Sequence, residues 1–337
     1  FALPNSLETA RITCARSCWA PPGNSGFCLF FFFQPLSAPP IDSLPFDQLL
    51  RFWQHPVRAF FQQRLRVNFR AEEDDIPDDE PFTLEGLSRY QLNQQLLNTL
   101  IEEQDVSAMF RRFRAAGELP YGAFGELVWE TQRLEMQALA ERVMAERQQA
   151  QSMEIDLQCG GVNLTGWLQQ VQPDGLLRWR PSLLSVSQGM QLWLEHLVYC
   201  SSGGTGESRL FVRKEGEWRF PALAPAEAQA YLNELVDGYL LGMSQPLLLL
   251  PESGGAWLKA CYDAEKDVIL MDEETQQKAR SKFLQTYEGN MVVSGEGADI
   301  WYQRLWRSLE PAHYEEIIAQ TQRYLLPLYR YHRSTQI

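Results

Sequence analysis

The stretch that decides the fold runs from 162 to 200 and reads VNLTGWLQQVQPDGLLRWRPSLLSVSQGMQLWLEHLVYC. Apolar and polar residues alternate over 162–171, which is typical of a half-buried strand. Pro173-Asp174-Gly175 marks a hairpin turn, and we expect a further strand over 176–185. The Leu- and Trp-rich segment 188–199 predicts a helix. The sequence therefore predicts an antiparallel strand pair followed by a helix.

Helices and strands are expected on both sides of this stretch. Met153, Ile155 and Leu157 alternate with polar residues and predict a half-buried strand before it. Apolar residues at helical spacing precede and follow Pro56, which should kink or split that helix. Further helices are expected at 87–103, 105–116, 124–143, 224–242, 253–262, 273–287, 297–309 and 312–324, and short strands at 210–212 and 218–220. This order suits an α/β or α+β sheet wrapped by helices.

The longest of these helices is predicted to be amphipathic. Six apolar residues are expected on one side of it, namely Phe124, Leu127, Val128, Leu134, Leu139 and Val143. We expect this side to face the interior.

The composition is that of an ordinary globular protein. The chain has 337 residues, of which 45% are hydrophobic and 22% are charged, enough for one large domain or two small ones. The formal net charge of −13 argues against a protein that coats nucleic acid by charge alone, because such binding neutralises phosphates with basic side chains. A local basic patch remains compatible with this charge.

Residues 1–41 differ from the rest and are interpreted as an atypical tail and linker ahead of a domain at 42–337. The first residue is Phe1 rather than Met, so we expect a piece of a longer polypeptide. A proline-rich run at 35–45 follows a segment of unusual composition.

Cysteine usage predicts a reducing, cytoplasmic location. The six cysteines form no disulfide framework. Cys14, Cys18 and Cys28 could offer three thiolates to a metal, but a structural zinc site uses four ligands, and free thiols are favoured. No run approaches the roughly 20 apolar residues of a membrane span.

Three local runs could bind a ligand, and each also has a plainer interpretation. The acidic run 71–80, AEEDDIPDDE, could hold Mg²⁺ or Ca²⁺, although a solvated loop is favoured. The loop 201–208 ends in Gly-Glu-Ser, whereas a phosphate-binding loop ends in Gly-Lys-Ser/Thr. Arg111, Arg112 and Arg114 could contact phosphate, although an exposed helix face is favoured.

The strand pair resembles the core of metal-dependent, restriction-endonuclease-like nucleases. Those enzymes place an Asp on one strand and an Asp/Glu-x-Lys triplet on the next, where alternation sends the acid and the lysine to one face. The strand Leu164–Val171 resembles the RecB-type nuclease strand, with Gln169 in the place of the metal-binding Asp. Pro181 and Leu183 stand where the triplet would be, and Gln191-Leu192-Trp193 resembles the start of the following helix. Proline and leucine cannot ligate a metal, and an amide is a poor ligand for a hard cation.

Longer strings resemble the C-terminal domain of the RecC family, the gamma subunits of exodeoxyribonuclease V. The resemblance covers about 35–337 and leaves out 1–34. Its strings are FWQHPVRAFF at 52–61, GELPYGAFG at 117–125, LLSVSQGMQLWLEH at 183–196, PESGGAWL at 251–258 and YEGN at 287–290.

This resemblance implies an α/β (α+β) fold of restriction-endonuclease-like, PD-(D/E)XK type, with a mixed sheet wrapped by helices and the catalytic residues lost. It further implies a non-catalytic scaffold that helps part DNA strands in a RecBCD-type helicase–nuclease for recombinational repair. The implied partners are RecB-like and RecD-like subunits, a duplex DNA end and single-stranded DNA. No cofactor or metal is implied.

Two enzymatic alternatives were weighed against this interpretation. An active nuclease with migrated metal ligands would recruit Asp156, Asp174 and Glu195, but no triplet has the required spacing. A small-molecule hydrolase would need a catalytic base, and His196 is the strongest candidate among four histidines, the others being His55, His313 and His332. A Gly-x-Ser-x-Gly motif is absent.

For a DNA-contacting domain, the best local candidates are Arg178, Trp179 and Arg180 on the expected strand. Arginine can meet phosphate and tryptophan can stack on a base, although an exposed strand face explains the same residues.

Overall fold

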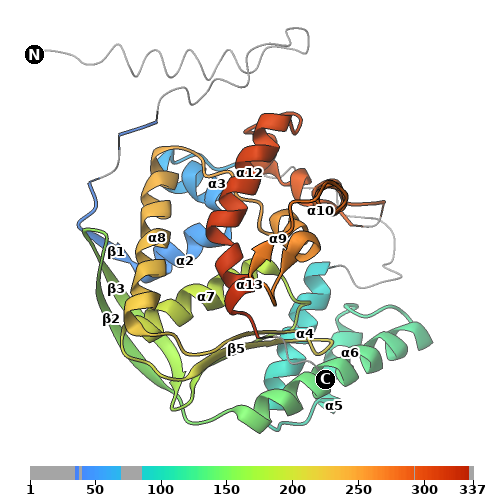
Figure 1. Ribbon diagram of the computed structural model, residues 1–337. Helices are drawn as coiled ribbons and strands as arrows, with labels where there is room; N and C mark the ends of the chain where they lie inside the picture. The colour runs from blue at the N-terminus through green and yellow to red at the C-terminus, as the bar shows by residue number, and fades with distance from the viewer. Residues whose placement is uncertain (1–34, 38–39, 70–85, 292, 334–337) are drawn as a thin grey trace, which may run out of the picture.

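The computed structural model describes residues 35–37, 40–69, 86–291 and 293–333 (Figure 1). The acidic run 71–80 and the three cysteines Cys14, Cys18 and Cys28 lie outside the described residues. The main sheet has six strands, which are β1 (Ser43–Pro45), β2 (Gln151–Cys159), β3 (Val162–Gln172), β4 (Gly175–Arg180), β5 (Glu207–Val212) and β6 (Glu217–Phe220).

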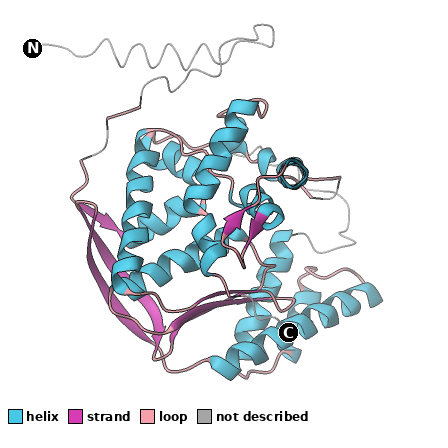
Figure 2. Cartoon of the chain, in the orientation of Figure 1, coloured by secondary structure: helices cyan, strands magenta, loops and turns pink. Residues whose placement is uncertain are grey.

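Helices cover both faces of this sheet (Figure 2). The N-terminal half contributes α2 (Phe46–Gln54), α3 (Pro56–Ala59), the π-helical turn η2 (Phe60–Arg64), α4 (Gly86–Ile101), α5 (Ser107–Ala115) and α6 (Ala123–Glu146). The C-terminal half contributes α7 (Val186–Ser201), α8 (Pro225–Ser244), α9 (Pro251–Cys261), α10 (Glu273–Glu288), the 3₁₀ turn η3 (Glu296–Ala298), α11 (Ile300–Gln303), α12 (Pro311–Tyr324) and α13 (Leu326–Tyr331), with the small ribbon β7 (Tyr262–Asp263) and β8 (Val268–Ile269). The architecture is thus mixed α/β with a mixed sheet, as expected.

Two hydrophobic cores lie on opposite faces of the sheet. The larger core packs α2, α7, α8, α9 and the C-terminal helices against one face and includes Leu176 and Leu210. The smaller core packs α4, α5 and α6 against the other face and includes Leu177 and Phe211. Adjacent residues of one strand enter different cores because side chains alternate across a sheet.

Strand β3 has an unusual pairing pattern. Strand β2 runs antiparallel along almost the whole of one edge of β3, from Cys159↔Val162 to Gln151↔Val171. The other edge is shared: β1 pairs in parallel up to Thr165 and β4 pairs antiparallel only at Val171 and Gln172. Among the described strands, none therefore pairs with residues 166–170 of β3 on that edge. Beyond the hairpin, β4 leaves β3 and pairs in parallel with β5 from Gly175↔Glu207 to Arg180↔Val212.

Helix α7 is central to the larger core. It is apolar almost all round, which is typical of a fully buried helix, and Met190, Leu194 and Leu197 have no exposed surface. Its first turn is capped by Ser185 Oγ, which accepts a hydrogen bond from the Gln188 N–H at 3.2 Å. The Glu252 carboxylate accepts two more, from the backbone N–H groups of residues 186 and 187, each at 3.0 Å. A buried helix start is satisfied in this way without water.

A second carboxylate repeats this arrangement one helix further on. Glu296 accepts hydrogen bonds from the Glu252 N–H at 3.1 Å and the Ser253 N–H at 2.7 Å, at the start of α9. Burial raises the pKa of Glu296 to about 7. The loop before α11 therefore caps α9, whose own first turn caps α7.

The expected order of elements between 162 and 200 is confirmed, with two changes of length. Strand β4 ends at Arg180 rather than at Ser185, because Pro181 has no N–H for the ladder. Helix α7 begins at Val186, two residues before the expected start. The expected break at Pro56 is confirmed, since α2 ends at Gln54 and α3 begins at Pro56.

Two other expectations are wrong in part. The apolar residues of α6 do not all face the interior: Leu139 and Val143 are buried, whereas Phe124 is 71% and Leu127 65% exposed. The six residues span too wide an arc for one contact face.

The segment 297–309 was expected to be one helix, but the structure has the short η3 and α11 there. The Asp299 carboxylate caps α11 by accepting from the Trp301 N–H at 2.8 Å.

Gly189 provides a test of the packing between α7 and β6. A Cβ at this position would lie 2.4 Å from Cε2 of Trp218, whose indole N–H donates to the Ser185 carbonyl at 2.9 Å. Gly189→Ala must displace the indole, so we expect a loss of about 2 kcal/mol in the free energy of unfolding, measured by urea denaturation. Gly86→Ala in α4, where no atom lies within 4 Å, is the matched control and should be neutral or stabilising by up to about 1 kcal/mol. Equal losses in both variants would contradict this packing.

His196 on α7 provides a pH test of the larger core. It has no exposed surface; its Nε2–H donates to the Pro221 carbonyl at 3.0 Å, so Nδ1 accepts the Ser208 hydroxyl at 2.7 Å. Burial lowers the pKa of His196 to about 4.

Because the unfolded chain binds a proton at His196 that the folded chain does not, stability should fall as pH drops from about 6.5 to about 4. Over that window His196→Asn should flatten the pH dependence of the unfolding free energy by about 1.4 kcal/mol per pH unit. Urea denaturation at closely spaced pH values measures both slopes, and parallel slopes in the two proteins would rule out a neutral, buried imidazole.

Candidate functional site

The unpaired edge of β3 opens a pocket between the start of α2 and the divergence of β3 from β4. Its volume is about 340 Å³, and its lining includes Trp167, Gln169, Gln170, Arg178 and Glu195. The pocket exists because β1 turns into α2 just where it leaves β3, while β4 has not yet joined it. This is the part of the fold that carries the positions singled out in the sequence.

Arg178 crosses the gap between β4, β3 and α7. Its Nε donates to Glu195 Oε2 at 2.7 Å, and its Nη2 donates to the Gln169 carbonyl at 2.7 Å. Its Nη1 donates to the carbonyls of Gln170 at 3.1 Å and Leu177 at 3.2 Å. A guanidinium has five N–H donors in a fixed plane, and here they are directed at oxygens from three elements.

Glu195 is the acid of this pocket. Its side chain is 19% exposed, and that of Arg178 is 21% exposed. Burial raises the pKa of Glu195, and the nearby Arg178 guanidinium opposes that rise. The Glu195 carboxylate is therefore largely shielded from water and paired with the Arg178 guanidinium. Removing the guanidinium would be costly, because it would leave the carboxylate without a counter-charge.

The positions compared with nuclease residues are spread over two environments. Gln169 is exposed on β3, and its side-chain oxygen accepts a hydrogen bond from Ser152. Pro181 and Leu183 lie beyond the end of β4, in the connection to α7. The residues that stand two apart near the end of β4 are Arg178 and Arg180, which the sequence predicts as DNA contacts rather than as counterparts of the nuclease triplet.

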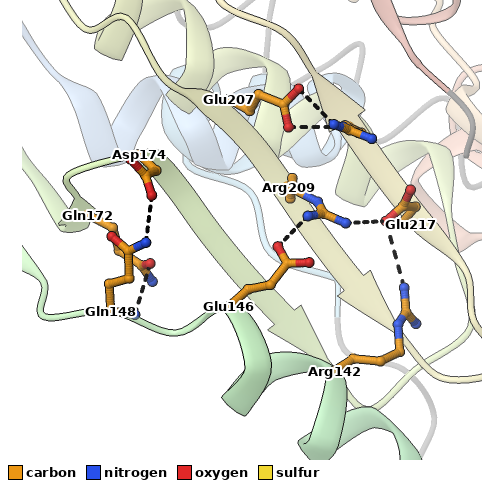
Figure 3. Close-up of polar contacts among 9 residues, drawn as sticks. Arg142, Glu146, Gln148, Gln172, Asp174, Glu207, Arg209 and Glu217 are labelled. Carbon is orange, nitrogen blue, oxygen red and sulfur yellow. Dashed lines mark hydrogen bonds and ion pairs between the residues drawn. The ribbon is translucent and has the colours of Figure 1, made fainter.

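The three acids considered as migrated metal ligands each have another polar partner. Asp156 on β2 accepts from Asn163 Nδ2 at 2.9 Å. Asp174 in the hairpin turn accepts from Gln148 Nε2 at 2.6 Å (Figure 3). Glu195 pairs with Arg178. Within the described ranges, no group of three or more His, Cys, Asp or Glu residues is arranged to hold a metal ion.

The face of β5 and β6 toward α6 carries an ion-pair network rather than a basic patch (Figure 3). Arg209 of β5 pairs with Glu146 of α6 and, at 3.2 Å, with Glu217 of β6. Arg142 of α6 also reaches Glu217, at 3.7 Å. Since these arginines are matched by acids, they fix α6 to the sheet and are poor candidates for phosphate contacts.

The arginines of α5 are exposed, but two of them have partners. Arg112 donates to Gln95 Oε1 and lies over the Phe113 ring at 5.4 Å. Arg114 lies 3.6 Å from Glu126, and both side chains are 61% exposed, a geometry that stabilises little. Arg111 is exposed on the same helix. This cluster remains a candidate phosphate contact.

Of the candidates on β4, Arg180 is exposed, Arg178 is engaged in the pocket, and Trp179 is half-buried against the smaller core. The Arg147 guanidinium lies 5.9 Å from the centre of the Trp179 ring. Trp167, which the sequence reading did not select, is 56% exposed beside the pocket.

A second, polar pocket of about 320 Å³ adjoins the first and shares Gln169, Gln170 and Trp179 with it. Its wall is dominated by side-chain amides, from Gln148, Gln149, Gln151, Gln169, Gln170 and Gln172. Amides offer both donors and acceptors, as the edge of an unpaired base does. Trp167 and this amide surface lie in adjoining pockets and form a candidate single-strand contact surface, and Arg180 is an exposed arginine at the end of β4.

The four histidines have hydrogen-bond or ionic partners within the fold. His196 is buried with both ring nitrogens bonded. The Nδ1 atoms of His55, His313 and His332 each accept a backbone N–H, at 3.1, 3.3 and 3.3 Å. His55 also lies 3.3 Å from Asp299, which caps α11.

Among the described helices, none is long and apolar enough to cross a membrane.

Comparison with known proteins agrees with the resemblance seen in the sequence. The family model described as the RecC C-terminal domain matches residues 41–262. The RecBCD enzyme subunit RecC of Escherichia coli (strain K12) is 69% identical over 303 residues, which are 90% of this chain and 27% of that protein. The subunit of the same name from Buchnera aphidicola subsp. Acyrthosiphon pisum is 32% identical over 83% of this chain and 26% of that protein.

A more distant relative, the RecBCD enzyme subunit RecC of Mycolicibacterium smegmatis, is 25% identical over 95% of this chain and 29% of that protein. The chain thus spans little more than a quarter of the length of these curated relatives. The family model covers most of the sheet and the helices that pack on both of its faces. The chain belongs to the family of RecC C-terminal domains.

Proposed function

We propose that this chain is a non-catalytic part of a RecBCD-type helicase–nuclease, exodeoxyribonuclease V, in recombinational repair. It acts there as a scaffold for RecB-like and RecD-like subunits and helps to separate the strands at a duplex DNA end. Support comes from its family and from relatives that carry the name of a RecBCD subunit.

The proposed fold is that of a restriction-endonuclease-like nuclease without its catalytic residues. In its favour, β3, the hairpin turn, β4 and α7 follow one another in the order that such a core uses. The proposed domain spans 42–337 behind a tail at 1–41, and the proposed location is the cytoplasm.

The observation that carries the non-catalytic assignment is the position of Arg178. A metal-dependent nuclease needs acids free to hold a cation, but in this pocket the acid Glu195 is already paired with a guanidinium at 2.7 Å. Gln169, Pro181 and Leu183 do not fit a divalent metal either, since an uncharged amide and two apolar side chains cannot replace carboxylates.

The proposed DNA contacts are made by the candidate single-strand surface, with Arg180 for phosphate and Trp167 or Trp179 for bases. Arg111, Arg112 and Arg114 on α5 are further candidates for the duplex backbone. In this view Arg178 supports the surface from beneath rather than contacting DNA, because its donors are directed at protein oxygens.

A cleavage assay tests the absence of catalysis. With linear and plasmid DNA in the presence of Mg²⁺ or Mn²⁺, the purified chain should produce no cleavage above a protein-free control, and calorimetry should detect no stoichiometric metal. Cleavage that disappears in Asp156→Asn, Asp174→Asn or Glu195→Gln would instead establish the alternative, an active nuclease with migrated ligands.

A binding assay tests the single-strand surface. Arg180→Ala should weaken binding to an oligothymidylate several-fold and reduce the slope of log affinity against log salt by about 0.7, as expected for one lost phosphate contact. Trp167→Ala should weaken binding by about 1–3 kcal/mol, with the salt slope unchanged, because stacking involves no charge.

Arg307→Ala, which removes an equally exposed arginine before α12, is the matched control for charge. Fluorescence anisotropy at several salt concentrations measures all four proteins. Equal affinities in wild type, Arg180→Ala and Trp167→Ala would remove β3 and β4 from the DNA-contact surface.

A further inference from the structure

Four oxygen atoms surround the guanidinium of Arg178 in the gap between β3 and β4. Three are the main-chain carbonyls of Gln169, Gln170 and Leu177, and the fourth is a carboxylate oxygen of Glu195. Consecutive carbonyls of a regular strand point to opposite edges, so a regular β3 could not offer Gln169 and Gln170 to the same partner.

The backbone of β3 is distorted in a way that makes this arrangement possible. Gln170 has a φ of 54°, in the left-handed region that a residue with a side chain rarely adopts. The register between β2 and β3 shifts at the same place, between the pairs Gln151↔Val171 and Met153↔Leu168. A bulge of this kind redirects main-chain groups and disrupts the ladder locally. Here it directs two successive carbonyls into the gap.

The set of donors is that of a site for a hard cation. Main-chain carbonyls and a carboxylate are the ligands that Ca²⁺ uses in proteins. They carry one negative charge in total, which a single guanidinium balances. The pocket of about 340 Å³ opens on the same residues, so solvent ions have a path to this gap.

We propose that these four oxygens form a cation site that is filled by the chain's own Arg178. The guanidinium neutralises Glu195 and closes the unpaired edge of β3, and it excludes a divalent cation by occupying its place. Arginine suits the role because its planar fork reaches oxygens on β3, β4 and α7 at once. This inference shares the Arg178–Glu195 contact with the proposed function, but the two fail separately, because Arg178→Ala can lack a Ca²⁺ site while the wild type still cleaves no DNA.

Removing the guanidinium should therefore create a binding site. In Arg178→Ala, calorimetry should detect one bound Ca²⁺ with a dissociation constant on the order of 1 mM, a weak value expected for a single carboxylate. Tb³⁺ should bind at the same place and show luminescence sensitised by a nearby tryptophan. Wild type and Arg180→Ala, which loses an equal charge from the same strand, should bind neither ion. Arg178→Ala combined with Glu195→Gln should lose the site again.

Free guanidinium ion provides a second readout. At about 20 mM guanidinium chloride, Arg178→Ala should gain several degrees in Tm relative to equal NaCl, while wild type and Arg180→Ala should lose Tm, as the denaturing action of the ion requires. A folded Arg178→Ala that binds no Ca²⁺ or Tb³⁺ and is not stabilised by guanidinium would overturn the proposal.

A third measurement applies to the wild-type protein, should Arg178→Ala not fold. By NMR, the Nε–H of Arg178 should exchange with water at least tenfold more slowly than that of the exposed Arg180. In Glu195→Gln the Arg178 exchange rate should rise while that of Arg180 stays the same. Equal rates for the two arginines in the wild-type protein would show that no cage holds Arg178, and the proposal would fail.

Discussion

Side chains that alternate across two short strands connect the two halves of this molecule. Leu176 of β4 packs with α7 and α8 in the larger core, and Leu177 packs with α4 and α6 in the smaller one. Strand β5 repeats the pattern with Leu210 and Phe211, so β4 and β5 together join the helices on the two faces. The ion pairs of Arg209 and Arg142 with acids of α6 and β6 reinforce the same junction, although their contribution depends on their partial burial.

The candidate site lies where β4 leaves β3 soon after the hairpin, while the other edge of β4 stays paired with β5 over six residues. Main-chain oxygens on the abandoned edge then need donors, because unsatisfied buried carbonyls are costly. Arg178 supplies them and brings with it the charge that permits Glu195 to sit at 19% side-chain exposure. Arg178 therefore satisfies both the unpaired carbonyls of β3 and the buried acid Glu195.

The sequence allowed much of the fold to be predicted, and the limits of that prediction are local and physical. Alternation over 162–171, the Pro-Asp-Gly turn and the apolar 188–199 segment predicted β3, the hairpin and α7, because these signals are short-range. The parallel partner of β3, Ser43–Pro45, lies 120 residues away, and three residues are too few to show a periodicity. The predicted strand 176–185 runs past the observed end of β4 at Arg180, because apolar residues continue beyond Pro181 although proline has no N–H for the ladder. The DNA-contact candidates remain predictions.

The way Arg178 is held also bears on which substitutions the domain tolerates. Only the main-chain carbonyl of Gln169 bonds Arg178, whereas its side-chain Oε1 accepts from Ser152 of β2, so the side chain at 169 can change without removing that contact. Losing the arginine would leave four oxygens and a buried acid without a counter-charge, at a cost of several kcal/mol. Retention of Arg178 is therefore a requirement of folding, whatever the domain does.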